Sequence, residues 1–329
     1  MAIAIIGAGV AGLSAASDMK RAGREVVIFD KGRGAGGRLS TRRASTPAGD
    51  LRFDHGAQFF TARDTGFRAL VSDLESRGHV AKWAPSRVAL STDGGTWSPA
   101  PLHSEDDWYV GAPSMNSLVK GMAEGHDVRW GERATGLSIR EDGRYVHIDA
   151  SGWQGPFETV IFAIPAEQAR ELLADTSPEL ASEAAASVTA PCWAVMLAFD
   201  TPIETGWDVA EVSGSPLNLL VRNSSKPGRA NEETFVLHAT PEWTRTNVDM
   251  EKEQVAEELS GLFSQITGAG APSLAAAHRW LYAKTETAAA SPYGWDEAQR
   301  IGVIGDWRIA PRIEAAWQSG HALAASLVD

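Results

Sequence analysis

Residues 2–12 read AIAIIGAGVAG, and this stretch decides the fold. Its apolar run Ala2–Ile6 predicts a buried parallel strand. Val10–Arg21 has helical spacing and is followed by Gly23, a glycine typical of a helix C-terminus. Glu25–Phe29 predicts a second strand, so this region is expected to form a strand–helix–strand unit with parallel strands.

A GxGxxG pattern, made by Gly7, Gly9 and Gly12, joins the first strand to the helix. Gly7 permits a tight turn, Gly9 lets backbone approach a pyrophosphate, and Gly12 lets the helix pack on the strand. The N–H groups at the helix start, near Ala11, would bind the phosphates at the positive end of the helix dipole. Asp30 follows the second strand and would accept hydrogen bonds from a ribose. This context predicts a dinucleotide site, the alternative being a glycine-rich turn without a ligand.

Two further segments favour FAD over NAD. Gly32–Arg38 is a glycine-packed loop in which Arg38 offers bidentate donors to a pyrophosphate. Asp306 follows the predicted strand Ile301–Ile304 and can place a carboxylate on ribityl hydroxyls. The last predicted helix, Glu314–Leu327, would point its positive end at the pyrimidine edge of an isoalloxazine.

Together these motifs resemble the flavin-containing amine oxidase superfamily and, within it, the renalase branch. The closer cues are FDHGAQFFTARD at Phe53–Asp64, RNSSKPGR at Arg222–Arg229 and HRWLYA at His278–Ala283. The resemblance implies an α/β fold, with a Rossmann-type FAD-binding domain and an inserted α+β substrate domain, as in p-hydroxybenzoate hydroxylase. The implied division assigns residues 1–65, 112–170 and 275–329 to the FAD-binding domain, and residues 66–111 and 171–274 to the substrate domain.

The resemblance also implies noncovalent FAD and a set of residues that contact it. The implied contacts are Gly7, Gly9, Ala11, Gly12, Asp30, Lys31, Gly37, Arg38, Gly56, Ala57, Gln58, Ala134, Asp306, Ala315, Ala316 and Trp317. Within this set, the segment from Gly56 to Gln58 would pass near the flavin ring and Ala134 would meet the adenine. The helix start from Ala315 to Trp317 would face flavin O2.

The kind of flavoenzyme is narrowed by what the sequence lacks. It has no second GxGxxG and only one cysteine, Cys192, which argues against a reductase with its own NAD(P)H domain and against a dithiol enzyme. Amine oxidases of the superfamily carry a lysine near flavin N5. The matching position in the predicted strand Trp193–Phe199 is Ala194, and the nearest lysines, Lys120 and Lys226, are distant in the sequence. The renalase branch oxidises dihydronicotinamides instead, a reaction that regains an aromatic ring and needs mainly positioning.

The leading hypothesis is therefore an FAD-dependent oxidase of the 2- and 6-dihydro isomers of β-NAD(P)H. Hydride would pass to flavin N5, and O2 would reoxidise the flavin, giving H2O2 and β-NAD(P)⁺. One alternative is an amine oxidase or other oxidoreductase of the same superfamily, and another is a non-catalytic flavin-binding sensor or interaction protein. The candidate catalytic residues are Thr61, Asn223, His238, Trp243 and Trp280. The plainer interpretation of each is a strand, turn or core residue.

Composition limits the partners. A net charge of −12 over 329 residues disfavours nucleic acid and anionic lipid, and no apolar run is long enough for a spanning helix. No cluster of residues has metal-ligand spacing. We expect a cytoplasmic protein whose partners are a small-molecule dinucleotide substrate and O2, with the oligomeric state left open. Arg222, Arg229 and Arg279 could meet substrate phosphates or form exposed salt bridges.

Other elements are predicted from periodicity and from turn residues. Lys31–Arg43 and residues 224–231 are expected as loops, and Ser114 as the cap of a helix that ends near Glu124. The remaining predicted strands are Tyr145–Ala150, Val160–Ile164 and Thr234–Ala239, and the remaining helices are Ala166–Leu173 and Asp249–Phe263.

Overall fold

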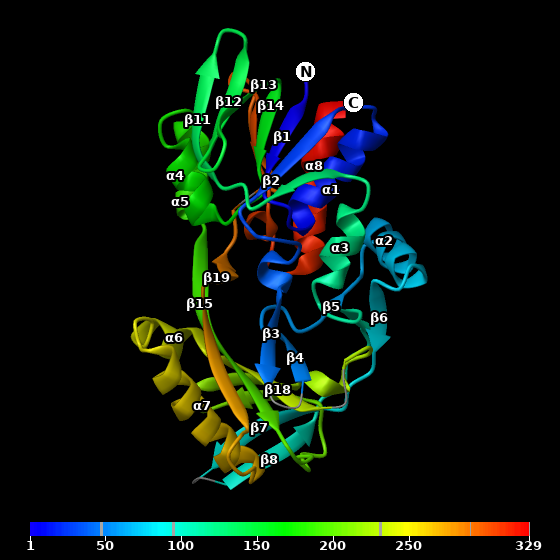
Figure 1. Ribbon diagram of the computed structural model, residues 1–329, viewed down its shortest axis with the longest axis vertical. Helices are drawn as coiled ribbons and strands as arrows, with labels where there is room; N and C mark the ends of the chain where they lie inside the picture. The colour runs from blue at the N-terminus through cyan, green and yellow to red at the C-terminus, as the bar shows by residue number, and fades with distance from the viewer. Residues whose placement is uncertain (47–48, 94–95, 230–231, 290, 329) are drawn as a thin grey trace.

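The computed structural model of the chain describes residues 1–46, 49–93, 96–229, 232–289 and 291–328. Figure 1 shows two sheet-based halves, with both chain termini in the upper half and the long strands β15 (Val188–Phe199) and β19 (Leu274–Thr287) running toward the lower one. Residues 230 and 231 of the predicted loop 224–231 lie outside the described residues.

The upper half is built on a six-stranded sheet. Its order is β10 (Asp127–Trp130), β2 (Val26–Asp30), β1 (Ile3–Ile6), β14 (Thr159–Phe162), β21 (Ile301–Val303) and β20 (Gly294–Asp296), and only β20 pairs antiparallel. Both faces of β1 are buried, because Ile3 and Ile5 pack toward α1 (Val10–Arg21) and α8 (Ile313–Val328) while Ala4 and Ile6 pack into a second cluster. A continuous apolar run is therefore what this strand requires.

Smaller elements cover the upper sheet. The second cluster includes the three-stranded sheet of β11 (Ala134–Arg140), β12 (Gly143–Ile148) and β13 (Gly152–Phe157), together with α4 (Ala166–Leu173) and α5 (Pro178–Ala186). On the other side, α3 (Ser117–Ala123) and α2 (Thr65–Ser76) join the cluster of α1. A short sheet of β5 (Phe60–Thr61), β9 (Trp108–Gly111) and β6 (Val80–Trp83) also belongs to this cluster, and β5 contacts α8.

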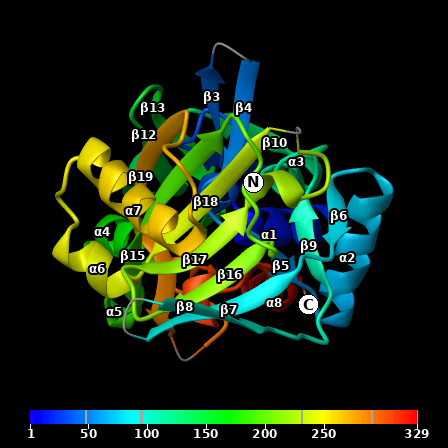
Figure 2. The same ribbon diagram turned by 90° about the horizontal axis from the view of Figure 1, so that it is seen from below.

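The lower half is a seven-stranded sheet, seen from below in Figure 2. Its order is β19, β15, β18 (Glu233–Ala239), β17 (Leu217–Arg222), β16 (Val209–Ser213), β7 (Arg87–Asp93) and β8 (Thr96–Pro101). Alternate residues of β15 face opposite sides, as the pleat requires. Val195 and Leu197 pack in the cluster of α7 (Lys252–Thr267), beside α6 (Pro241–Thr246), whereas Met196 and Ala198 pack against the hairpin of β3 (Thr41–Thr46) and β4 (Gly49–Asp54).

Most predicted elements are confirmed, and α1 and α4 have the predicted bounds. Three details were wrong. Ser114 is not a helix cap: α3 begins at Ser117, and the Ser114 hydroxyl donates to the Asn116 side chain instead. The end of the supposed loop Lys31–Arg43 forms a 3-10 turn, Gly37–Leu39, and the first residues of β3. The helix predicted from Asp249 starts at Lys252 and runs on to Thr267, where Gly268 with φ +73° ends it.

The division of the chain into domains stays a prediction. The strand β19, which that division places in the FAD-binding domain, pairs with β15 in the seven-stranded sheet. Within the described ranges, no helix is both long and apolar enough to span a membrane.

Candidate functional site

The N-terminus of α1 forms an open cradle at the end of β1. A Cβ at Gly7, where φ is +110°, would collide with the carbonyl oxygen of Ala163, and one at Gly12 would collide with that of Gly7. At Gly9, by contrast, a Cβ would meet no protein atom within 4 Å. Gly9 is the N-cap residue and brings no side-chain cap, so the N–H groups of the first turn are available to an external acceptor. This geometry fits a pyrophosphate.

Asp30 lies beside this cradle at the end of β2. Its carboxylate accepts hydrogen bonds from the N–H groups of Ala8 (2.7 Å) and Gly32 (2.7 Å). The neighbouring Lys31 donates to Gln168 Oε1 at 3.1 Å. Ala134 opens β11 shortly after Glu132, whose N–H donates to the carbonyl of Asp30. The structure thus brings Asp30, Lys31 and the chain just before Ala134 to one end of the cradle.

Arg38 and Asp306 mark the opposite end. The Arg38 guanidinium makes a bidentate ion pair with Asp306, in which Nη1 donates to Oδ2 at 2.9 Å. Asp306 follows β21, is 6 % exposed, and is also approached by the Thr285 hydroxyl at 3.4 Å. The pair joins the glycine-rich loop to the end of the last parallel strand.

We expect Asp306→Ala to release more flavin than Asp30→Ala. Each change removes charge-assisted hydrogen bonds worth about 1.5–3 kcal/mol, but Asp306 is buried, so less water can replace what it loses. The flavin-to-protein ratio of the two purified variants is the measurement. Equal flavin contents would contradict the expectation.

The segment from His55 to Gln58 runs directly past Arg38. The Ala57 N–H donates to the Arg38 carbonyl at 2.9 Å, and a Cβ at Gly56 would collide with that same oxygen. On the other side, Trp280 Nε1 donates to the His55 carbonyl at 2.9 Å. The segment is therefore fixed between the Arg38–Asp306 pair and the long strand β19.

Behind this segment lies a buried polar cluster, which we call the Asp54 cluster: Asp54, Gln58, Lys226, Arg229 and His238. Lys226 Nζ donates to Gln58 Oε1 at 2.9 Å and to Asp54 Oδ2 at 3.4 Å. Arg229 Nη2 contacts the same Asp54 oxygen at 2.5 Å. Gln58 Nε2 donates to the carbonyls of Asp54 (2.5 Å) and Gly56 (2.9 Å) and lies 3.3 Å from His238 Nε2.

Burial sets the protonation states in this cluster. Burial alone would raise the pKa of Asp54, but the cations Lys226 and Arg229 outweigh it and lower that pKa to about 2. Burial, only partly opposed by Asp54, lowers the pKa of Lys226 to about 8. Burial and then the charge of Lys226 lower the pKa of His238 to about 4, so this imidazole is neutral at pH 7.

An aromatic corner adjoins the cluster on the sheet side. His238 and His278 are the partners of Ala194 on the two neighbouring strands, so all three side chains share one face of the sheet. The ring centroid of His278 lies 4.7 Å from that of His55 and 4.6 Å from that of Trp280. Burial lowers the pKa of His55 to about 4, and its Nδ1 is buried without a hydrogen-bond partner among the described residues. The His55 imidazole is thus uncharged at pH 7 and has one unsatisfied ring nitrogen, and the charge of Arg42 also helps to lower the pKa of both His55 and His278.

The start of α8 is tied to the segment after β5. Glu314 is buried, and its Oε1 accepts the N–H groups of Arg63 (2.7 Å) and Asp64 (2.6 Å). Ala315 is fully buried. The Trp317 ring turns the other way, packing against Phe67 and stacking on His321.

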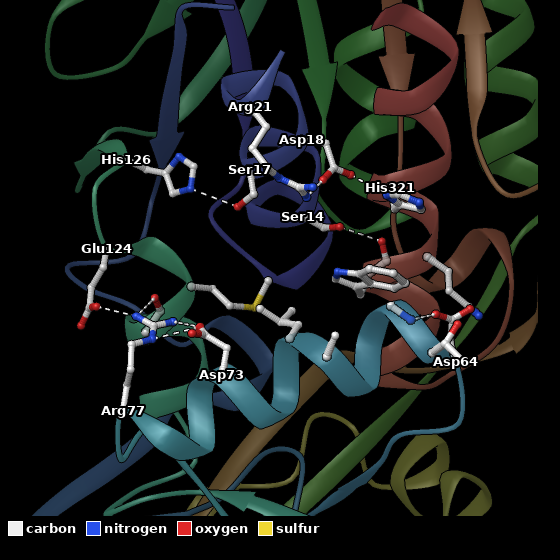
Figure 3. Close-up of a pocket in the computed structure, with 18 residues that line it drawn as sticks. Ser14, Ser17, Asp18, Arg21, Asp64, Asp73, Arg77, Glu124, His126 and His321 are labelled. Atoms are coloured by element: carbon white, nitrogen blue, oxygen red, sulfur yellow. Dashed lines mark hydrogen bonds and ion pairs between the residues drawn. The ribbon is translucent and has the colours of Figure 1, made fainter. Parts of the chain in front are cut away.

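A cavity of about 850 Å³ lies elsewhere, between α1, α2, α3 and α8 (Figure 3). Its charged lining is paired internally: Arg77 reaches Asp73 and Glu124, and Asp18 contacts Arg21 and His321. Four carboxylates line the cavity, those of Asp18, Asp64, Asp73 and Glu124, against the two guanidinium groups of Arg21 and Arg77, so its lining is negative and does not favour an anionic ligand. Among the described residues, no group of three or more His, Cys, Asp or Glu is arranged to hold a metal ion.

Comparison with known proteins decides the family. Residues 5–74 match the model of the NAD(P)-binding Rossmann-like domain, and residues 72–325 match that of the flavin containing amine oxidoreductase family. The chain belongs to the flavin-containing amine oxidoreductase family. Its fold accordingly combines a Rossmann-like dinucleotide domain with an amine-oxidase-type domain, and it is an FAD-dependent oxidoreductase.

Solved structures share the fold of this amine oxidoreductase at low sequence identity. Cyclohexylamine oxidase from Brevibacterium oxydans IH-35A is similar with a TM-score of 0.79 and 12 % identity, over 99 % of this chain and 98 % of that one. A protein from Exiguobacterium sp. 255-15 assigned as a protoporphyrinogen oxidase gives 0.78 and 14 %, with the same shares covered. Putrescine oxidase bound to putrescine gives 0.75 and 13 %, again over 99 % and 98 %.

The structure of this amine oxidoreductase separates the five candidate catalytic residues. His238 and Trp280 lie together at the aromatic corner, whereas Thr61 lies in β5 beside the start of α8. The Asn223 amide is engaged by protein, since its Oδ1 accepts the Asp54 N–H and its Nδ2 donates to the Arg52 carbonyl. Trp243 packs in the cluster of α7, on the opposite face of the sheet.

The three arginines considered for substrate phosphates are all ion-paired. Arg222 pairs with Glu233, Arg229 with Asp54 and Arg279 with Asp249. Only Arg229 is buried, and its partner belongs to the Asp54 cluster.

The most prominent site feature that the sequence did not predict is Lys226. Distance along the chain suggested that no lysine lies near the flavin-facing segment, but folding brings Lys226 within 2.9 Å of Gln58. Its side chain is 0 % exposed and already paired, so it cannot project into the aromatic corner. The signal was present in the SKPGR motif, where a lysine and an arginine flank proline and glycine. That motif does not reveal the partners of Lys226, Gln58 and Asp54, which belong to the FDHGAQ motif.

Proposed function

We propose that this protein is a renalase-like FAD-dependent oxidase of the 2- and 6-dihydro isomers of β-NAD(P)H. The balanced reaction is NAD(P)H isomer + O2 + H⁺ → β-NAD(P)⁺ + H2O2. The observation that supports it best is the neutral aromatic corner around Ala194, where both His55 and His238 have a pKa of about 4. Hydride loss from a dihydronicotinamide releases no proton with the hydride, so such a site needs no free base.

The proposed cofactor placement follows from the cradle. The pyrophosphate would lie on Gly7, Gly9, Ala11 and Gly12, with the adenosine toward Asp30, Lys31 and Ala134. The flavin half would then extend in the opposite direction.

The flavin half would run past the Arg38–Asp306 pair to the segment from Gly56 to Gln58. Gly37 would lie along the same path, and Ala315, Ala316 and the backbone of Trp317 would face the flavin from the start of α8. Bound there, FAD supplies a two-electron acceptor and the means to pass electrons to O2.

The protein's own residues would position the substrate. Trp280, held by the His55 carbonyl, and His278 form a wall on which a nicotinamide ring can pack. His55 Nδ1, which is buried without a partner among the described residues, could accept a hydrogen bond from a carboxamide N–H or donate one to its oxygen. We assign His238 a positioning role, because its ring lies against Gln58 and hydrogen-bonds the His55 backbone.

An amine oxidase is the second candidate, favoured by the family itself and by neighbours named for cyclohexylamine and putrescine. Against it, the resemblance matches Ala194 to the amine-oxidase lysine, and Lys226 is buried and bonded to Gln58. Noncovalent FAD is consistent with Cys192, since burial raises the pKa of its thiol to about 12 and leaves no thiolate to attach flavin. The cytoplasmic location expected from the sequence stays a prediction.

Anaerobic stopped-flow mixing tests the proposal. We expect rapid bleaching of the flavin by 2- or 6-dihydronicotinamide dinucleotides, and bleaching slower by at least about a hundredfold with the ordinary 4-dihydro isomer. A ring placed for C2 or C6 displaces C4 from its reactive position, and a misplacement of only about 1 Å can already cost about a hundredfold in rate. Simple monoamines are the comparison. Rapid reduction by a monoamine, with no response to the dihydro isomers, would establish the amine-oxidase alternative instead.

A further inference from the structure

We propose that the Asp54 cluster carries one uncompensated positive charge, and that this charge stabilises the flavin in its reduced, anionic form. The inference rests on the flavin placement proposed above, beside the segment from Gly56 to Gln58. It assigns Lys226 a role in setting the reduction potential, separate from substrate binding.

The charge count is the first step. The cluster holds one carboxylate, Asp54, and two cations, Lys226 and Arg229, whose side chains are 1 %, 0 % and 3 % exposed. The other polar contacts of the two cations are neutral: Gln58 Oε1 for Lys226, and the carbonyls of Gly111 and Pro227 for Arg229. Among the described residues, no second carboxylate contacts either cation. The enclosed charge is therefore +1.

The second step is that this charge is costly unless something balances it. Moving an ion out of water carries a large desolvation penalty, which a single shared carboxylate compensates for only one of the two cations. The ring of Trp83, whose centroid lies 5.9 Å from Lys226 Nζ, adds a weak cation–π contact. A buried excess of positive charge is expected beside a group that becomes negative during the reaction.

The third step links the charge to the cofactor site. Lys226 donates to Gln58 Oε1, and Gln58 Nε2 donates to the Gly56 carbonyl at 2.9 Å. Gly56 in turn lies against Arg38, the partner of Asp306. The ammonium is thus separated by one side-chain amide from the backbone expected to border the flavin. Because Lys226 and Gln58 are both buried, solvent should screen this interaction only weakly.

The fourth step is the electron balance. Reduction of the flavin by a hydride adds two electrons and one proton, so the isoalloxazine gains one negative charge when no further proton binds. A fixed positive charge nearby lowers the free energy of that product and not of the neutral oxidised ring. Sulfite adds to oxidised flavin with the same gain of negative charge, so its affinity reports the same interaction without any substrate.

The test compares Lys226→Met with a control, Lys82→Met, in the flavin-loaded protein. Lys226→Met removes the surplus and leaves Asp54 and Arg229 as a balanced pair, whereas Lys82 is an exposed lysine paired with Asp107 on the strand that carries Trp83. We expect Lys226→Met to lower the midpoint potential by about 30 mV or more, which corresponds to a tenfold change in the reduction equilibrium. Sulfite should bind about tenfold more weakly, Lys226→Arg should restore both values, and the control should match wild type.

Wild-type protein offers an independent measurement if Lys226→Met does not fold. Because burial lowers the pKa of Lys226 to about 8, the charge is lost above that pH in the oxidised protein, and reduction then takes up a second proton. The potential should therefore fall by about 30 mV per pH unit below pH 8 and about twice as steeply above it.

A slope of about 60 mV per pH unit already below pH 8, which would mean that the reduced flavin is neutral there, or unchanged potential and sulfite affinity in flavin-loaded Lys226→Met, would overturn the inference. Neither measurement uses a dihydronicotinamide. A failed substrate proposal would therefore show in the stopped-flow experiment and not here.

Discussion

Asp54→Asn is expected to destabilise the folded protein by about 3–5 kcal/mol, the cost of removing one partner from a buried ion cluster. The substitution keeps the shape of the side chain but leaves Lys226 and Arg229 buried without a counter-charge. Urea unfolding of the flavin-loaded protein at pH 7 measures the loss. The matched control is Asp106→Asn, which breaks the exposed pair with Arg63 and should leave the free energy of unfolding nearly unchanged.

The pH dependence of this loss follows from the pKa values. The pKa of Asp54 in the folded protein is about 2, below its ordinary 3.8, so its contribution to stability is complete above pH 4 and disappears as pH falls through 2. Asp54→Asn, which has no carboxylate to protonate, should not show this loss of stability at acid pH. At alkaline pH, Lys226 can release its proton and relieve the unpaired charge, so the deficit of Asp54→Asn should shrink between pH 7 and 9. A deficit that is constant with pH would contradict this account of the cluster.

Gly9→Ala is expected to abolish flavin retention while leaving the fold intact. No protein atom lies within 4 Å of the added Cβ, and the Gly9 backbone has φ −80°, which alanine adopts without strain. The methyl group instead occupies the position where the pyrophosphate must approach the helix N-terminus. We expect FAD to bind at least a hundredfold more weakly, or about 2.8 kcal/mol.

Fluorescence titration of the apoprotein with FAD, together with its thermal unfolding, separates these two effects. Gly261→Ala is the control, because that glycine lies in α7 and an added Cβ there also meets nothing within 4 Å. Tight FAD binding by Gly9→Ala would show that the cofactor does not rest on this turn. A fall in the melting temperature of the apoprotein would show that the glycine serves the fold instead.

The sequence alone determined the dinucleotide half of the molecule. The strand–helix–strand unit at Ile3–Asp30 and the bounds of α1 and α4 follow from short-range patterns: apolar runs, helical periodicity, and glycines at turns. Such patterns act between residues that are neighbours along the chain, so they hold before any long-range contact forms. The family follows from the same motifs, because GxGxxG, the glycine–arginine loop and Gly305–Asp306 each have a local geometry of their own.

Only the tertiary structure decided the composition of the candidate site. Asp54 and Lys226 lie 172 positions apart in the chain, and His278 faces Ala194 only because β19 pairs with β15 in one particular register. A shift of one residue would turn His238 and His278 to the α7 side of the sheet, where Trp243 packs. Pairing register and the desolvation of charges depend on the whole packed core. A lysine that the sequence presents as distant and unremarkable therefore becomes, in the fold, a buried cation beside the flavin-facing segment.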